Sequence, residues 1–490
     1  MDQKGPVQDD DAQLAAMGHR PELKRQFSTW AMLGLAFAVL NVRDQNFPNI
    51  PSSQYLQLTD TVLDCSFSEL VNQFNIWGQH ECHLGAGGQY HWVAVISWPR
   101  WVPILSWITG WINVAGWVAL VATNSLLSSQ LIVGIISAMH PSYEPQRWQQ
   151  FLIYIGLTLG AFVINAFMNS ILPIIYRGAF TWSIGGFAIV CITVLACASP
   201  DFNSAYFVFA KFVNETGWPD GVAWLLGVRS APRGYALSLT IMTALARWPW
   251  SHCIVIQDAV AHMIEEVPNP SIEGPKIMVS CVGIGTFTGC VFLIVLLFVA
   301  GDMNTVTTSA AGPLLQILID ATKNKAGAIC LLMLPIVCLI MAILSVMTTS
   351  SRMIYAFARD GGLPASKFFA TVHPTLQLPL NALVLTVVVD GTRSRSEDGN
   401  YPPPSGGFAI LMQISLSYIA LTTVLFVFPP SSTVTGSSMN YCIAAFAVII
   451  IISVFQWIVD GRKNFTGPRI DLGVDGAEVI PAGHDHDYEK

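Results

Sequence analysis

The sequence has little charge. Only 11% of its 490 residues are Asp, Glu, Lys or Arg, whereas 53% are hydrophobic. A soluble domain cannot bury so much apolar surface, so the composition excludes an ordinary soluble protein and predicts an integral membrane protein. The net charge of -7 forms no basic stripe with interleaved aromatic residues, which excludes nucleic acid as a partner.

Motifs for catalysis and cofactor binding are also missing. No hydrolase elbow, phosphate loop or dinucleotide fingerprint stands in a fitting context, so we predict neither an enzyme nor a bound cofactor. Seven of the ten cysteines lie inside apolar runs, where a free thiol behaves as a small hydrophobe, and no disulfide framework is expected. In the run His80-Glu81-Cys82-His83 the ligands are too close together for a structural zinc site, so no metal is predicted.

What the chain does have is a series of apolar runs. Eight are long enough to cross a bilayer as helices, which takes about 20 residues each. They lie at residues 102–137, 150–174, 178–199, 219–256 with internal breaks, 277–301, 326–351, 406–428 and 440–459. The run 102–137 has no turn signal or charge at its centre, so it predicts one long tilted helix. Two more runs, 30–42 and 379–389, are too short to cross and are predicted to be re-entrant or interfacial.

Positive charge gathers in three clusters, which predicts the orientation, because Lys and Arg accumulate in cytoplasmic loops. The clusters are Lys4, Arg20, Lys24 and Arg25; Arg352, Arg359 and Lys367; and Arg462, Lys463 and Arg469. If the eight long runs cross and the two short ones do not, all three clusters lie on one side. We therefore predict cytoplasmic tails at 1–28 and 461–490 around a transmembrane domain at 29–460, with no signal peptide.

Polar residues inside apolar helices are costly, so they usually face a cavity or a partner helix. One such face of the run 102–137 carries Thr109, Asn113, Gly116, Thr123 and Asn124, and Asn165 and Asn169 form a second stripe in the next run. Each stripe can line a substrate path or bond a neighbouring helix, and both interpretations are open. Trp111 and Trp117 lie deep in the first run, either as an aromatic wall for a cation or as ordinary packing.

The stretch "QDAVAHMIEEVPNPSIEGPKI" at residues 257–277 places three titratable residues at helical spacing. Asp258, His262 and Glu265 are spaced i, i+4 and i+7, so a helix would bring them to one face, where they could relay protons or hold a cation. In the alternative interpretation, Glu265 and Glu266 only mark a solvated helix end ahead of two prolines.

Three stretches resemble fungal amino acid and choline permeases of the amino acid, polyamine and organocation superfamily. They are "GGQYHWVAVISWPRWVPILSWITGWINVAGW" (87–117), "AHMIEEVPNPSIEGPK" (261–276) and "SSRMIYAFARDGGLPASKFF" (350–369). Within the third, "YAFARDGGLP" is the most specific part. The likeness extends over roughly four fifths of the chain.

The resemblance implies a secondary transporter of twelve helices with two inverted repeats, which holds its substrate at unwound turns of the first and sixth helices. It implies uptake of choline or of an amino acid such as 4-aminobutyrate at the plasma membrane, commonly driven by protons. The partners expected are a small-molecule substrate and membrane lipid. The substrate-binding candidates are Asn41, Asn113, Gly116, Trp117 and Asp258, and the candidates for proton or cation coupling are Asp258, His262 and Glu265.

Three segments depart from the family pattern, at 42–85, 228–257 and 391–405, and the first two replace both binding turns. Val-Arg opens the first two segments, as translation of a retained intron beginning with GT would. We therefore expect an all-α inverted-repeat bundle that is incomplete, with about eight full spans and two short runs. Prolines and charges without an apolar face predict weak packing at 42–85 and 391–405. The alternative function is a non-transporting permease-like membrane protein, either a degraded paralogue or a nutrient sensor.

Overall fold

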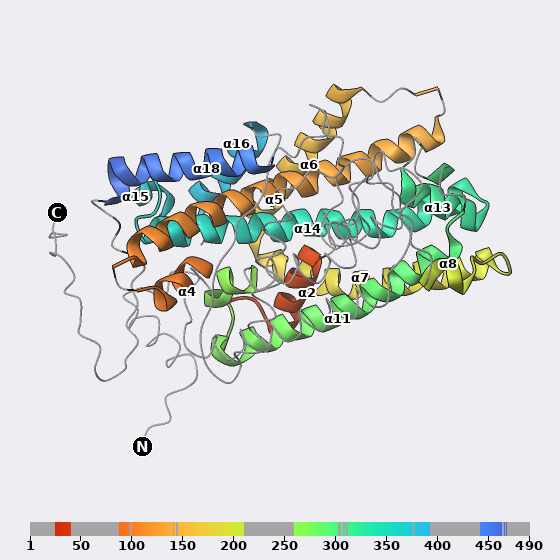
Figure 1. The fold of residues 1–490 in the computed structure, drawn as a ribbon, viewed down its shortest axis with the longest axis horizontal. Coiled ribbons are helices and arrows are strands. Elements are labelled where there is room, and N and C mark those ends of the chain that lie inside the picture. Colours follow the sequence, from red (N-terminus) through yellow and green to blue (C-terminus); the bar gives the residue numbers. More distant parts are fainter. Residues whose placement is uncertain are drawn as a thin grey trace, which may run out of the picture.

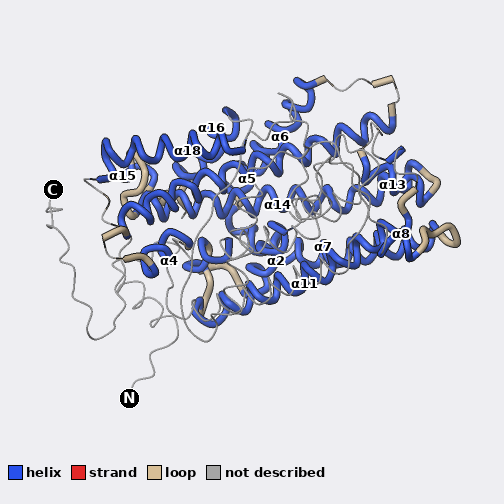
Figure 2. The backbone as a smooth tube through the Cα atoms, in the orientation of Figure 1, coloured by secondary structure: helices blue, strands red, loops and turns tan. Residues whose placement is uncertain are grey.

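The computed structural model describes residues 25–40, 88–98, 100–140, 142–143, 146–209, 259–301, 305–306, 309, 312–374, 376, 378–392, 442–462, 465 and 467. Within these ranges every regular element is a helix, and none is a strand (Figure 2). The prediction of an all-α protein is therefore confirmed.

Five of the described helices are long and apolar enough to cross a membrane: α5 (Val102–Met139), α6 (Arg147–Phe167), α7 (Leu172–Ala198), α11 (Pro270–Val299) and α14 (Lys325–Arg359). The shorter ones are α2 (Thr29–Leu40), α4 (Gln89–Ile96), α8 (Ala205–Phe209), α13 (Pro313–Thr322), α15 (Ser366–Phe369), α16 (Leu380–Thr392) and α18 (Cys442–Gln456). Two 3-10 turns, η1 (Asn169–Ile171) and η2 (Ile264–Glu266), and the π-helical η3 (Trp457–Gly461) complete the described elements.

The long helices lie side by side along the length of the molecule, with α4 and α15 near one end and α8 and α13 near the other (Figure 1). The central helix is α14, which packs against α5, α2, α7, α6 and α16. Its 35 residues rise about 52 Å at 1.5 Å per residue, more than the apolar layer of about 30 Å. One end of α14 is therefore long enough to leave the apolar layer.

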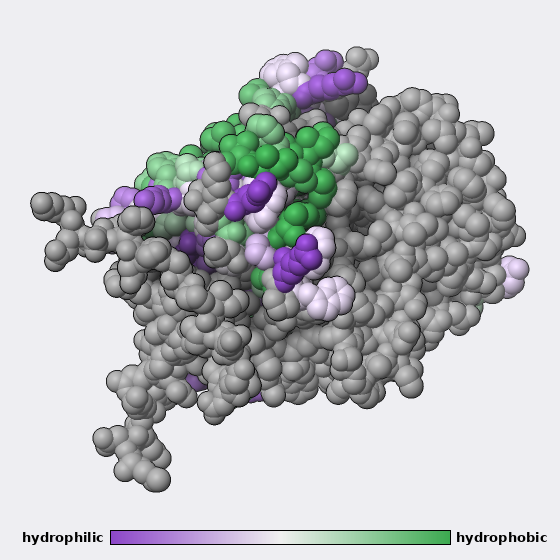
Figure 3. All heavy atoms as spheres, turned by 60° about the vertical axis from the view of Figure 1, so that its left-hand side comes forward, coloured by the Kyte–Doolittle hydropathy of each residue, from purple (hydrophilic) through white to green (hydrophobic). Residues whose placement is uncertain are grey.

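Apolar side chains also cover the outside of the bundle. Ile192, Phe287, Ile451 and Phe455 are each more than 60% exposed. Figure 3 shows apolar side chains gathered in one area of the visible face, with hydrophilic ones at its borders. Monomeric soluble proteins rarely expose such surface, whereas lipid-facing helices do. The prediction of a multi-pass membrane protein is thereby confirmed.

One predicted helix agrees with the structure, and two predicted limits do not. The run 102–137 forms one helix, as predicted, whereas the run 326–351 continues as α14 to Arg359. The break predicted between residues 174 and 178 is wrong, because α6 ends at Phe167 and Pro173 lies in the first turn of α7, where proline is well tolerated. Asn165 and Asn169 therefore belong to different elements, so the second polar stripe does not exist.

The first short run forms α2, which is buried inside the bundle. Residues 31–38 of α2 are all buried, and the helix packs against α7, α11 and α14. An interfacial position for this run is therefore wrong. The backbones of α2 and α7 approach closely at Gly34, where an added Cβ would lie 1.9 Å from the carbonyl oxygen of Tyr176.

Several predictions fall outside the described residues. These include the spans at 406–428 and at 219–256, and the atypical segments 42–85, 228–257 and 393–405. Weak packing of 42–85 and 391–405 and the complete count of crossings therefore stay predictions.

Candidate functional site

The segment from residue 259 to 270 does not form one continuous helix. A helical stretch over 259–262 ends at His262, a turn follows, the 3-10 element η2 spans Ile264–Glu266, and α11 begins at Pro270. Pro268 disfavours helical backbone at Val267 and cannot donate a helix hydrogen bond, so the segment does not run on as one α-helix into α11. The prediction that His262 and Glu265 share a helix face is therefore wrong. Asp258 lies outside the described residues.

His262 faces α5 and is fully buried. Its Nε2 lies 3.4 Å from Nδ2 of Asn113, and its ring meets that of Trp117 edge-on with centroids 5.9 Å apart. The amide and the imidazole can therefore share a hydrogen bond within the bundle. The structure thus joins two substrate-binding candidates and one coupling candidate, and we call Asn113, Trp117 and His262 the α5–His262 site.

Among the other residues predicted on the polar face of α5, two bond their own helix and one is exposed. The hydroxyls of Thr109 and Thr123 donate to carbonyl oxygens of their own helix, at Leu105 and Ala119, over 2.8 Å each. Gly116 is exposed, and a Cβ added there would meet no atom within 4 Å. Its role in binding stays a prediction, as does that of Asn41, which lies outside the described residues.

Trp111 is not part of the α5–His262 site. Its ring lies 6.2 Å from that of Trp107, whose own ring packs on Trp457 and Phe465. These contacts favour the packing interpretation for Trp111.

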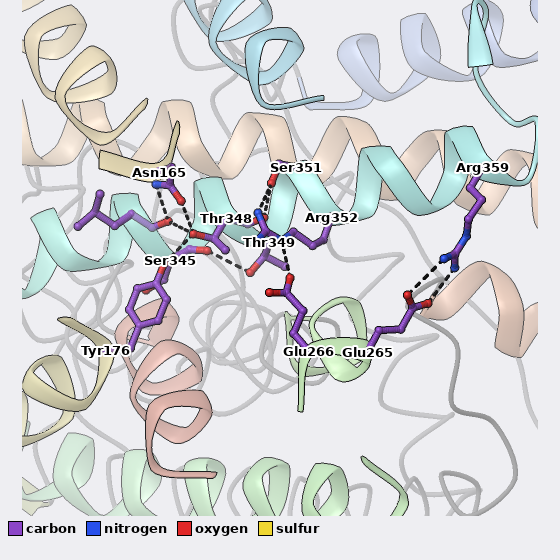
Figure 4. Close-up of polar contacts among 11 residues, drawn as sticks. Asn165, Tyr176, Glu265, Glu266, Ser345, Thr348, Thr349, Ser351, Arg352 and Arg359 are labelled. Carbon is purple, nitrogen blue, oxygen red and sulfur yellow. Dashed lines mark hydrogen bonds and ion pairs between the residues drawn. The ribbon is translucent and has the colours of Figure 1, made fainter. Parts of the chain in front are cut away.

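The two adjacent glutamates of η2 each bind an arginine of α14, as Figure 4 shows. Oε1 of Glu266 accepts a hydrogen bond of 2.7 Å from Nε of Arg352, and the two side chains are 2% and 3% exposed. Arg359 binds Glu265 with both terminal nitrogens, over 2.8 Å and 3.2 Å. Bidentate arginine–carboxylate pairs are strong and directional. The interpretation of a solvated helix end is therefore wrong.

A third contact ties α4 to the same end of α14. Oδ2 of Asp360 accepts a hydrogen bond of 2.8 Å from the hydroxyl of Tyr90 and lies 3.0 Å from Nε2 of His91. Burial raises the pKa of Tyr90 well above 10, and the Asp360 carboxylate raises it further, so the phenol remains a neutral donor. We call Arg352, Arg359 and Asp360, with their partners, the α14 end cluster.

The segment before α2 is attached close to this cluster. Phe27 is buried and stacks on Tyr176 with ring centroids 5.9 Å apart, and its backbone N–H donates to the carbonyl oxygen of Glu266 over 3.3 Å. The hydroxyl of Thr29 donates to Glu273 of α11 over 2.9 Å. Segments far apart in the sequence therefore close one end of the bundle around α14.

A buried hydrogen-bond chain joins α6, α14 and α7. Thr348 donates to Oδ1 of Asn165 over 2.5 Å, and the hydroxyl of Tyr176 lies 2.6 Å from that of Thr348 (Figure 4). Asn165 also donates to the carbonyl oxygen of Leu344 over 3.3 Å.

The sequence alone predicted neither this hydrogen-bond chain nor the two arginine–glutamate ion pairs. The spacing of seven between Arg352 and Arg359, opposite two adjacent glutamates, was the signal that could have indicated the ion pairs.

An all-helical bundle with apolar outer faces and buried polar contacts between its helices is typical of multi-pass membrane transporters. Residues 83–394 match the family described as amino acid permease, and the chain belongs to that family. It is a secondary transporter of the amino acid and organocation class. The match begins near the end of the atypical segment 42–85 and ends within 391–405.

Two relatives illustrate the range of the family. A choline transporter of Saccharomyces cerevisiae is 28% identical over 507 residues, covering 95% of this chain and 85% of the relative. A putative amino acid/polyamine transporter of Macrophomina phaseolina is 29% identical over 404 residues, covering 74% and 84%. Among solved structures, a nucleobase-cation-symport-1 family transporter with bromovinylhydantoin bound aligns with a TM-score of 0.43 and 13% identity, over 90% of this chain and 80% of that one.

Proposed function

We propose that this protein takes up a small amine-bearing solute across the plasma membrane, with choline as the first candidate and an amino acid such as 4-aminobutyrate as the second. Both tails, at 1–28 and 461–490, lie in the cytoplasm under this proposal. The observation that carries it is the α5–His262 site, where an amide and an indole of the longest described helix meet an imidazole from a distant segment.

The chemistry of the site favours an organic cation over a carboxylate. Indole faces attract quaternary ammonium groups, and Trp117 supplies one at the site. A substrate carboxylate would be bound by a cationic side chain or by free backbone N–H groups at a helix end. The two buried arginines of α14, Arg352 and Arg359, are already paired with glutamates.

Replacing Trp117 by leucine is expected to weaken choline uptake about tenfold or more, because a desolvated cation–π contact contributes on the order of 2 kcal/mol. The measurement is the concentration dependence of labelled choline uptake in a strain that lacks its own choline and amino acid permeases, with 4-aminobutyrate in parallel. Trp111→Leu is the matched control, since it makes the same change on the same helix outside the site. Equal effects of the two substitutions would refute the placement of the cation at Trp117.

We also propose that uptake is coupled to protons through His262. His262→Gln keeps a similar shape and a partner for Asn113 but cannot take up a proton at neutral pH. We expect it to abolish uptake driven by a pH gradient, while exchange of labelled for unlabelled choline persists. His140→Gln, at the exposed C-terminal end of α5, should leave both unchanged. Gradient-driven uptake at the native rate in His262→Gln would disprove the coupling role.

The other two candidates for proton or cation coupling are Glu265 and Asp258. Glu265 is held by Arg359 in a bidentate ion pair, which favours a structural role for its carboxylate. Asp258 lies outside the described residues, and its role as a substrate or coupling group stays a prediction.

The alternative is a non-transporting permease-like protein, and the segment that bears on it is 42–85, most of which lies before the family match at 83–394. The discriminating experiment replaces residues 42–85 by the corresponding segment of an intact relative. Absence of uptake in the native chain, together with its appearance in the chimera, would support the alternative. Uptake by the native chain excludes it.

A further inference from the structure

The polar face of α5 continues beyond the α5–His262 site to Asn124. This residue follows Trp117 by seven positions and Asn113 by eleven, so it lies on the same helix face, about 10 Å further along than Trp117. Its side chain is fully buried.

Asn124 is unlike the polar residues around it. The hydroxyls of Thr123, Ser128 and Ser129 all donate to carbonyl oxygens of α5 itself. Both amide atoms of Asn124, in contrast, are buried without a hydrogen-bond partner in the part of the chain that the structure describes, as is the hydroxyl of the adjacent Ser125. The helix-packing interpretation requires a bond from Asn124 to a neighbouring helix, and the described residues supply none.

A buried amide without a partner lowers stability, whereas an apolar side chain of similar shape does not. Native structures rarely leave such a group unsatisfied unless a ligand or water completes it. An amide both donates and accepts, so it matches a group that also does both. The whole of α5 contains no Asp, Glu, Lys or Arg, so the helix offers no counterion to a charged group at this level.

We propose that Asn124 is a second solute-binding group, which hydrogen-bonds the hydroxyl of an amino alcohol such as choline as the solute moves along α5. This inference rests on the proposed function. The solute would meet the indole and imidazole at one level and the amide two turns further along the same helix face.

The test compares choline with ethyltrimethylammonium, which has the same cation but lacks the hydroxyl. The native protein should prefer choline about tenfold in competition against labelled choline uptake, and Asn124→Leu should reduce that preference to within about twofold. Thr123→Val is the matched control, because its hydroxyl bonds only its own helix, and it should keep the native preference. A native preference in Asn124→Leu would overturn the inference and leave the proposed function intact.

A second measurement does not depend on transport. Without solute, the purified Asn124→Leu protein in detergent should unfold at the native temperature or above it, because an unsatisfied amide has been replaced by apolar surface. A clear fall in that temperature would reveal a structural partner and overturn the inference. Uptake of 4-aminobutyrate without any uptake of choline would instead correct the proposed function, and the proposed hydroxyl contact would fail with it.

Discussion

Replacing Arg352 by methionine is expected to lower the free energy of unfolding by about 3–5 kcal/mol, because the Glu266 carboxylate would remain buried without its counterion. Both side chains of the pair are almost completely buried, and Nε of Arg352 lies 2.7 Å from Oε1 of Glu266. The measurement is denaturant or thermal unfolding of the purified protein in detergent.

Two controls separate this effect from a general loss of charge. Lys323→Met breaks an ion pair with Asp201 in which both side chains are more than 70% exposed, and it should cost at most about 1 kcal/mol. The double variant Arg352→Met with Glu266→Gln removes both charges and should recover much of the stability lost in the single variant. If the double variant is less stable than Arg352→Met alone, the account based on an uncompensated buried carboxylate is wrong.

Gly34→Ala is expected to destabilise the protein by about 3 kcal/mol or to prevent folding, because the packed backbones of α2 and α7 leave no room for a methyl group. The added Cβ would lie 1.9 Å from the carbonyl oxygen of Tyr176, and a backbone atom within a helix cannot rotate away as a flexible side chain could. The amount of folded protein recovered from membranes and its unfolding temperature both measure the effect.

Gly178→Ala is the matched control, since Gly178 lies two residues after Tyr176 in α7 and an added Cβ there meets no atom within 4 Å. It should leave stability unchanged or raise it by about 0.5–1 kcal/mol, because alanine is the better helix former. A native unfolding temperature in Gly34→Ala would show that α2 does not pack on α7 as described.

The apolar runs predicted much of the described fold. The run 102–137 predicted α5 within two residues at its end, and 440–459 predicted the helical region of α18 and η3. The predicted end of a helix was wrong where charged residues have distant partners inside the bundle. Arg352 and Arg359 look like the polar end of a span, but they belong to α14 because Glu266 and Glu265 neutralise them inside the bundle.

The sequence predicted the residues of the α5–His262 site, but it did not predict that His262 contacts Asn113 and Trp117. The face of α5 indicated Asn113 and Trp117, and helical spacing indicated His262, but the sequence placed His262 with Glu265. The chain leaves the α-helix after His262, so the two residues turn to different helices: His262 contacts α5, and Glu265 binds Arg359 of α14. Helical spacing alone assumed that the α-helix continues past His262, which it does not.

By itself, the sequence determined that this is a helical membrane protein, because a bilayer imposes a local requirement; the family followed from the likeness of its stretches to amino acid permeases. Each segment within the bilayer must be apolar and must satisfy its own backbone hydrogen bonds. Only the tertiary structure decided which polar groups meet. His262 reaches Asn113 across 149 positions, and Arg352 reaches Glu266 across 86. A polar residue in an apolar run indicates that it needs a partner, and the packing of the helices decides which one it finds.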